Sequence, residues 1–271
     1  MNSKNIAIIA AIAIIIIAGG VYASGLLSNS ANNVAGSDAN TVNVLAGAGF
    51  VKVTNDLKTE FEKKHPGVTV NVKNAGSAEI FGMLETQKTG DVFIPADYKY
   101  MEDAEKKGYV LNDTVKNITT NIPIIAVKKG NPKNINSLED MTKSGVKVAL
   151  GDPKGPAIGK TTEKILNKTN LTDEMKPNVV TYTTTVNQLL TYLITDQADA
   201  VIIWEDMATW DEGKGKIEVI TIPKNQNIIS TVPIATTVYA KNQWAAEFEN
   251  FVVSPEGLAI WKKWGFEPII K

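Results

Sequence analysis

The sequence predicts an α/β fold in which parallel strands are covered by helices. Three times in succession after residue 40, a short apolar strand is followed by a loop and an amphipathic helix. This order produces a parallel sheet, because consecutive strands joined by a helical crossover run in the same direction. No internal repeat of fixed short period is present, which excludes a solenoid. A chain of 271 residues suffices for one or two domains with hydrophobic cores.

Each element is recognised by its own periodicity. From Phe50 to Phe61 the apolar residues recur at helical spacing, and Pro66 followed by Gly67 ends that helix. Residues 68–73 alternate between apolar and polar, as a half-buried strand does. The other predicted strands are residues 42–46, 91–94, 122–127, 146–150, 179–182, 200–203, 217–221 and 232–240. The other predicted helices are residues 80–84, 98–107, a segment from 158 onward, 186–193 and 247–264, the last interrupted at 254–256.

The N-terminus departs from the composition of a soluble domain. Lys4 precedes an apolar run over residues 6–18, which small residues follow. Such a pattern is typical of an export signal, and the apolar stretch is also long enough to span a bilayer, which takes about 20 residues. We therefore expect residues 1–27 to form a hydrophobic helix that serves as a signal peptide or a membrane anchor. Residues 28–40 are rich in Ser, Asn, Ala and Gly and are expected to be a flexible linker.

The composition argues against several function classes. The formal net charge is −1, from 28 basic and 29 acidic residues, so no basic field is present to hold nucleic acid. The chain has no cysteine, and its single histidine, His65, lies at a helix end, which argues against zinc sites and against a metal centre. We expect no catalytic residues and no cofactor. Because carboxylates are plentiful, an enzyme that uses a pair of acids stays open as an alternative.

Small or hydroxyl-bearing residues lie at four predicted strand-to-helix turns. In an open α/β sheet, ligands bind outside the carboxyl ends of the strands, where the free N–H groups of helix N-termini point. Small side chains let an anion approach these groups, although Gly, Ser and Thr are also common in ordinary turns. The pattern predicts an anion site without Lys or Arg. The four turns are residues 47–49, 76–78, 156–159 and 183–185.

Nearly the whole chain after residue 40 resembles the molybdate-binding proteins of ABC transporters. The resemblance depends on the order and spacing of modest motifs. In the first half these motifs are VLAGAGF at 44–50, FEKKHPGV at 61–68, GSAEI at 76–80 and GDVFIPAD at 90–97. In the second half they are VALGDPKGPA at 148–157, DAVIIW at 199–204, VPIA at 232–235 and the segment 254–266.

The resemblance implies a two-lobed periplasmic-binding-protein type II fold with two hinge crossovers, near residues 120–126 and 230–235. Lobe one would comprise residues 41–122 and 234–271, and lobe two residues 123–233. The ligand would be molybdate or tungstate, held in the cleft between the lobes. The partner would be an ABC permease, and the protein would be a monomer at the extracellular face of the membrane.

The resemblance also implies which residues contact the oxyanion. Gly49 and Ser77 would do so from lobe one, Ala157 and Val186 through backbone N–H groups of lobe two, and Trp204 through its side chain. The family usually has Ser in place of Gly49 and Tyr in place of Trp204. An indole N–H donates but does not accept, which suits an anion. Trp204 is equally well interpreted as a core or cleft-wall residue.

Two carboxylates lie near these motifs. Asp152 and Glu205 are candidates for contacts with the ligand, because some archaeal relatives complete the coordination of the oxyanion with carboxylates. A carboxylate facing a dianion otherwise costs Coulomb energy, so we expect both side chains to point to solvent.

The sequence therefore predicts an exported solute-binding protein that captures molybdate or tungstate. Three alternatives stay open: the same fold with sulfate, phosphate or a small organic anion, an enzyme that uses cleft carboxylates, and an anchored adhesion or scaffold protein without a small ligand.

Overall fold

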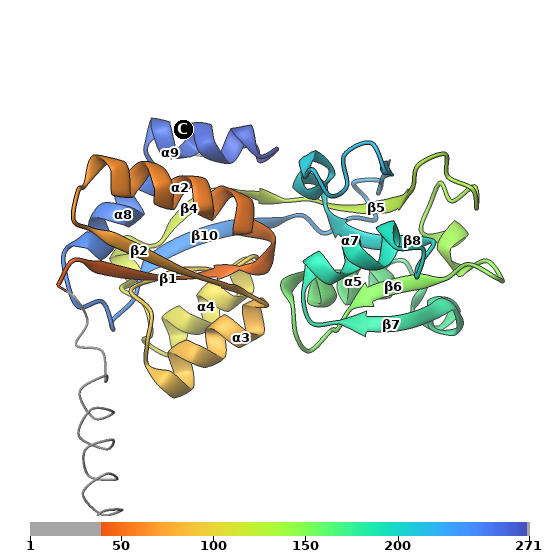
Figure 1. Ribbon diagram of the computed structural model, residues 1–271. Coiled ribbons are helices and arrows are strands. Elements are labelled where there is room, and N and C mark those ends of the chain that lie inside the picture. The colour runs from red at the N-terminus through yellow and green to blue at the C-terminus, as the bar shows by residue number, and fades with distance from the viewer. Residues whose placement is uncertain (1–38, 270–271) are drawn as a thin grey trace, which may run out of the picture. The chain divides into compact units, whose positions relative to one another are not determined.

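Two five-stranded sheets form the frame of the chain in the computed structural model (Figure 1), which describes residues 39–269. The strand order is β2-β1-β3-β10-β4 in the first sheet and β7-β6-β8-β5-β9 in the second. We call the first sheet with its helices lobe one, and the second sheet with its helices lobe two. Each lobe has a core of buried aliphatic and aromatic side chains between sheet and helices.

Lobe one contains a mixed sheet. Strand β1 pairs in parallel with β2 and β3, as the βα repeats predict, whereas β10 is antiparallel to both β3 and β4. The strands are β1 (Thr41–Gly47), β2 (Thr69–Ala75), β3 (Val92–Ile94), β4 (Lys116–Asn121) and β10 (Ser230–Thr236). The helices are η2 (Ala48–Phe50), α2 (Val51–Lys64), α3 (Ser77–Gly82), η3 (Met83–Gln87), α4 (Tyr98–Lys106), η4 (Asn112–Thr114), α8 (Trp244–Val252) and α9 (Pro255–Lys263).

Lobe two has the same kind of sheet. Strand β6 pairs in parallel with β7 and β8, and β5 is antiparallel to β8 and β9. The strands are β5 (Pro123–Lys128), β6 (Val148–Gly151), β7 (Val179–Thr183), β8 (Ala200–Trp204) and β9 (Ile217–Thr221). The helices are η5 (Glu139–Thr142), α5 (Ala157–Lys168), α6 (Thr172–Met175), η6 (Lys176–Asn178), α7 (Val186–Ile194) and η7 (Glu205–Thr209).

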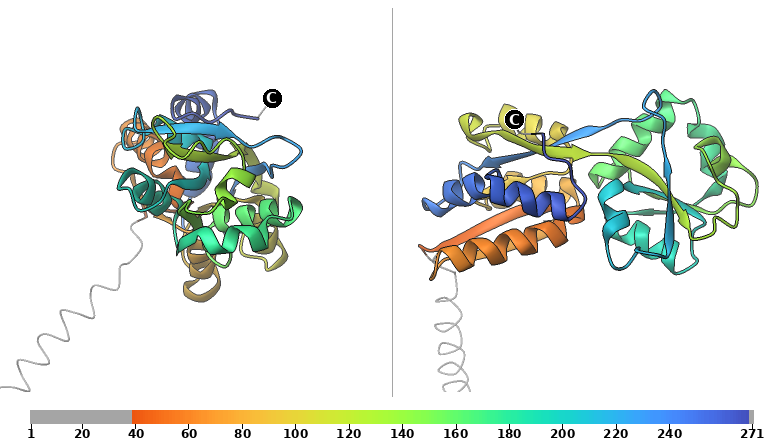
Figure 2. Two further views of the ribbon diagram at one scale, coloured as in Figure 1. Left: turned by 90° about the vertical axis from the view of Figure 1, so that its right-hand side faces the viewer. Right: turned by 90° about the horizontal axis from the view of Figure 1, so that it is seen from above.

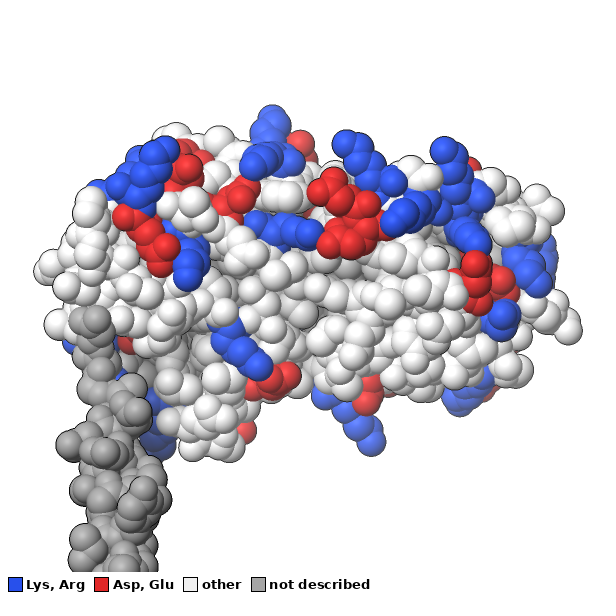
Figure 3. Space-filling view, viewed as in Figure 1, with Lys and Arg blue, Asp and Glu red and all other residues white. Residues whose placement is uncertain are grey.

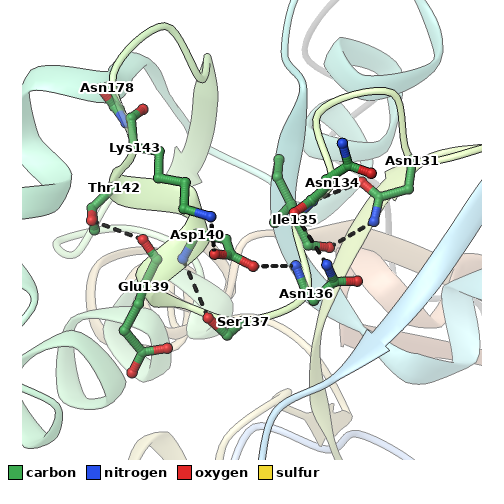
Figure 4. Close-up of polar contacts among 10 residues, drawn as sticks. All are labelled: Asn131, Asn134, Ile135, Asn136, Ser137, Glu139, Asp140, Thr142, Lys143 and Asn178. Atoms are coloured by element: carbon green, nitrogen blue, oxygen red, sulfur yellow. Dashed lines mark hydrogen bonds and ion pairs between the residues drawn. The ribbon is translucent and has the colours of Figure 1, made fainter.

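The long connection between β5 and β6 contains only the short turn η5, and polar side chains order it (Figure 4). The side-chain amide of Asn131 donates to the carbonyl of Ile135 at 2.8 Å and accepts from the backbone N–H of Ile135 at 2.9 Å. Asp140 accepts from the N–H of Asn136 at 2.7 Å. Asn178 donates to two carbonyl groups of the connection, at 2.7 Å each. These bonds satisfy backbone groups that no sheet or helix satisfies.

The chain passes between the lobes twice, and the views in Figure 2 show the two connections running beside each other. Only Ile122 separates β4 from β5, and residues 222–229 join β9 to β10. The amide of Asn227 donates to the carbonyl of Pro123 at 2.9 Å, which ties the second connection to the first. The sequence-based boundary at 122/123 coincides with the first connection. The boundary at 233/234 falls inside β10, whose pairing with β4 begins at Ser230.

The structure corrects one part of the strand prediction. Residues 116–121 were not expected to form a strand, yet they form β4 at the edge of the first sheet. This strand is mostly polar, and only three of its residues are buried, so it lacks an apolar run. The predicted N-terminal helix of residues 1–27 lies outside the described residues, as does most of the linker. Within residues 39–269 no helix is both long and apolar enough to cross a membrane.

Aromatic side chains attach the C-terminal helices to lobe one. The rings of Phe50 and Trp261 meet edge to face with centroids 5.2 Å apart, and Phe266 lies 4.9 Å from Trp261. On the same side of the sheet, Phe61 packs 5.1 Å from Phe248. Such edge-to-face pairs stabilise beyond their buried area by about 0.5–1.5 kcal/mol each. The chain therefore completes lobe one with its last helices.

Candidate functional site

A small cavity lies between the lobes, outside the carboxyl ends of the parallel strands. It is small: the space between its wall atoms, including the part open to solvent, is about 220 Å³. Because each wall segment either ends a strand or belongs to the turn after it, the cavity occupies the position where open α/β sheets bind ligands. We call it the interlobe cavity. Its walls are Ala48, Gly49, Gly76, Ser77 and Ala96 from lobe one, and Pro156, Ala157, Ile158, Val186 and Trp204 from lobe two.

The structure brings together all five residues that the sequence resemblance selected. These five residues, Gly49, Ser77, Ala157, Val186 and Trp204, line this one cavity, although the first and the last are 155 positions apart in the sequence (204 − 49). Asp152 and Glu205 do not line it. The carboxylate of Asp152 accepts from the N–H of Lys154 at 2.8 Å, and Glu205 is exposed. The walls of the interlobe cavity thus carry no charged side chain.

Helix N-termini supply most of the polar groups that face the cavity. Helix α3 begins after Gly76 and helix α5 after Pro156, and neither start has a side-chain cap. The first N–H groups of a helix have no partner within the helix, and the helix dipole makes that end partly positive. At α7, Gln188 accepts from the N–H groups of Thr184 and Thr185, which precede the helix. The N–H groups nearest the cavity are suited to an anion.

Ser77 has a hydroxyl group whose orientation the structure constrains. The side chain is buried, and its Oγ accepts a hydrogen bond from the N–H of Ala96 at 3.2 Å. Because a hydroxyl group both accepts and donates, its proton is left for a second partner in the cavity. The carbonyl of Ala96 accepts from Asn121 Nδ2 at 2.7 Å. Ala96, which orients Ser77, is therefore hydrogen-bonded through both its N–H and its carbonyl group.

Trp204 ends β8 and is both buried and part of the cavity wall. Its exposed fraction is 1%. A Cβ atom built on Gly49 would lie 3.4 Å from Trp204 Cδ1 and 3.9 Å from Nε1, so the pyrrole edge of the indole faces the turn of lobe one. The two interpretations of Trp204 are therefore compatible. The indole ring of Trp204 fills the space beside Gly49, and the indole N–H lies at the ring edge that faces Gly49.

Sequence reasoning missed two residues of the site. Ala96 lines the cavity, and it follows β3 at the same sheet edge as the turns that were selected. The rule that ligands bind outside the carboxyl ends of the strands, applied to the turn after β3, would have included Ala96. Asn121 acts through Ala96 from the end of β4, and only the tertiary structure brings these two residues together. Across residues 39–269, no cluster of three or more Asp, Glu or His side chains could hold a metal ion.

Asp206, next to the site in η7, is a buried acid. Its Oδ2 has no hydrogen-bond partner in the described part of the chain. Burial raises the pKa of this carboxyl well above its ordinary value of 3.8, whereas hydrogen bonds with the backbone and Trp210 lower the pKa by less, and nearby Glu205 raises it further. The folded protein thus binds the proton more tightly than the unfolded chain, and the free energy of unfolding falls as pH rises above about 3.8.

Asp206→Asn is therefore expected to raise the melting temperature at pH 7, because the amide resembles the protonated acid without its cost of ionisation. The gain should shrink as pH falls toward 4. Thermal unfolding followed by circular dichroism between pH 4 and 8 measures it, with exposed Asp211→Asn as the control. An equal effect of Asp206→Asn at every pH would contradict the assignment.

Comparison with known proteins gives the same fold and identifies the family. The chain matches the family model of bacterial extracellular solute-binding proteins over residues 42–267. The molybdate-binding protein ModA of Mycobacterium bovis is 29% identical over 250 residues, covering 90% of this chain and 93% of the relative.

Two solved structures are similar in fold. The periplasmic molybdate-binding protein of Azotobacter vinelandii has a TM-score of 0.69 at 16% identity, covering 83% of this chain and 98% of that one. The sulfate-binding protein SubI of Mycobacterium tuberculosis has a TM-score of 0.73 at 20% identity, covering 85% and 87%. These likenesses confirm the predicted two-sheet α/β architecture of periplasmic binding proteins. Since the family model spans most of the sequence, the chain belongs to the bacterial extracellular solute-binding proteins.

Proposed function

We propose that this protein captures molybdate or tungstate in the interlobe cavity and delivers it to the permease of an ABC transporter. The observation that carries the proposal is the convergence of helix N-termini and a buried hydroxyl on one cavity without charged walls. The molybdate-binding relatives support the choice of ligand. Binding at the extracellular face, as a monomer and without a catalytic step, belongs to the same proposal.

The polar groups proposed to bind the anion are all hydrogen-bond donors. They are the Ser77 hydroxyl, the Trp204 indole N–H and the backbone N–H groups of Gly49, Ala157 and Val186. A fully ionised oxyanion offers only acceptors and matches this set. Phosphate carries a proton near neutral pH, and the walls provide no carboxylate to accept it. Sulfate is smaller than molybdate and would leave donors without partners, each at a cost of about 1–3 kcal/mol.

The two lobes would act together. The anion binds to the donors of one lobe, and closure about the two connections brings in the donors of the other, as in other hinge-closing binding proteins. Closure excludes water, which strengthens each hydrogen bond to the anion. The permease would then recognise the closed form.

A thermal-shift titration with molybdate, tungstate, sulfate and phosphate tests the ligand. A ligand present at about 100 times its dissociation constant stabilises the folded state by about 2.7 kcal/mol. We expect molybdate and tungstate to raise the melting temperature and phosphate to have no effect. A response to sulfate alone would assign the site to sulfate, and no response to any of the four would contradict an oxyanion site.

Ser77→Ala is expected to weaken molybdate binding by about 10- to 150-fold. A hydrogen bond to a charged partner contributes about 1.5–3 kcal/mol, and this substitution removes one. Isothermal titration calorimetry measures the change, and Ser144→Ala, at an exposed serine of lobe two, is the matched control. An affinity equal to that of the control would remove Ser77 from the site.

A further inference from the structure

A second group of contacts joins the lobes beside the interlobe cavity. On lobe one it involves α4 and the residue that caps it, Asp97. On lobe two it involves α5 and the loop before it. In Figure 1, α4 and α5 lie on the sides of the lobes that face each other. The residues in contact are Asp97, Tyr100, Gly155, Lys160 and Thr161, and none of them lines the cavity.

Tyr100 makes the most specific of these contacts. Its side chain is 3% exposed, and its hydroxyl donates to the carbonyl oxygen of Gly155 at 2.9 Å. The ammonium group of Lys160 lies 4.1 Å from the centroid of the Tyr100 ring, at cation–π distance. Because both partners belong to lobe two, these interactions form only when the lobes are closed.

Asp97 connects the same two helices through its carboxylate. One oxygen caps α4 by accepting from the N–H of Lys99 at 2.8 Å. The other oxygen accepts from Thr161 Oγ1 at 3.4 Å and lies 4.0 Å from the ammonium group of Lys164. Asp97 and Thr161 are both buried. The bond from Thr161 is longer than an ordinary O–H···O hydrogen bond, and the nearby charge of Lys164 adds a second attraction between the lobes.

The opposite flank of the cleft also has an interlobe contact, but a more exposed one. Lys52 of lobe one pairs with Glu212 of lobe two at 2.8 Å, and their side chains are 28% and 48% exposed. Exposed pairs of this kind contribute little to stability. The contact between α4 and α5 is therefore more buried than this ion pair.

We propose that Asp97, Tyr100, Gly155, Lys160 and Thr161 form a latch that favours the closed arrangement before the anion arrives and so tightens anion binding. The effect on affinity rests on the proposed function. The apparent dissociation constant is the intrinsic one divided by the fraction of protein in the binding-competent arrangement. Loosening the latch lowers this fraction and weakens binding, although every group that touches the anion is unchanged.

The double variant Tyr100→Phe with Thr161→Val tests the latch. It removes two hydrogen bonds between the lobes and keeps the aromatic ring and the volume of both side chains. The whole chain has no cysteine, so cysteines introduced at Lys63 of lobe one and Lys143 of lobe two accept spin labels selectively. Double electron–electron resonance spectroscopy then measures the distance between the two spin labels, and so between the lobes, without and with molybdate.

We expect longer interlobe distances in the double variant without molybdate, and an affinity about fivefold weaker for each hydrogen bond lost. Tyr109→Phe is the control, because it removes a hydroxyl that donates to Glu85 within lobe one. It should leave the interlobe distances and the affinity unchanged. Distances equal to those of the parent protein would overturn the latch. If the parent protein binds no molybdate, the proposed function fails, and the distances without anion still decide on the latch.

Discussion

Gly76→Ala is expected to weaken anion binding by about 10- to 100-fold while both lobes stay folded. Gly76 precedes α3 in lobe one, and a Cβ atom at this position would lie 2.8 Å from the carbonyl oxygen of Thr184 in lobe two. This distance is shorter than van der Waals contact, and overpacking of this kind typically costs about 1–3 kcal/mol. Because the clash exists only between the lobes, it opposes closure and not the folding of either lobe.

Gly82→Ala is the matched control for this prediction. Gly82 ends the same helix, and nothing lies within 4 Å of a Cβ atom built there. Replacement of a helical glycine by alanine stabilises by about 0.5–1 kcal/mol, so the control should bind normally and melt slightly higher. Calorimetric titration with molybdate and thermal unfolding without it separate the two effects. Normal affinity of Gly76→Ala would show that the lobes bind the anion at a wider separation.

Trp204→Phe is expected to weaken molybdate binding by about 10- to 150-fold, because phenylalanine keeps an aromatic ring but removes the indole N–H. The estimate corresponds to the roughly 1.5–3 kcal/mol of a hydrogen bond to a charged partner. Isothermal titration calorimetry measures the loss. Unchanged affinity would mean that Trp204 only fills space in the cavity wall.

Adding Gly49→Ser to Trp204→Phe shows whether the affinity lost in Trp204→Phe comes from the missing indole N–H or from a missing packing contact. A Cβ atom at Gly49 would lie at ordinary van der Waals distance, 3.4 Å, from Trp204 and from Val186, so a serine fits there. In the Trp204→Phe background its hydroxyl would supply a new donor, and we expect part of the affinity to return. Gly49→Ala in the same background adds the carbon without the donor and should restore nothing.

Local patterns in the sequence predicted most of the elements. The helical spacing from Phe50 to Phe61 corresponds to α2, and the alternation at residues 68–73 corresponds to β2. The antiparallel pairing of β10 with β3 and β4 could not be predicted, because it joins segments more than 100 residues apart. The polar edge strand β4 was missed, since two of its three buried residues are polar and bond to distant parts of the chain, Thr119 to Glu267 and Asn121 to Ala96.

The sequence by itself predicted the kind of site, because small residues at strand-to-helix turns are a local property and parallel strands end at one sheet edge. The resemblance to the molybdate-binding proteins, and not this local pattern, selected Ser77 and Trp204 as candidate contacts. Only the tertiary structure decided how the two lobes approach, bringing Gly76 against Thr184 and Tyr100 against Gly155. Contacts of this kind depend on angstrom-level distances between segments that are separate in the chain, and residue types and their spacing carry no such distances.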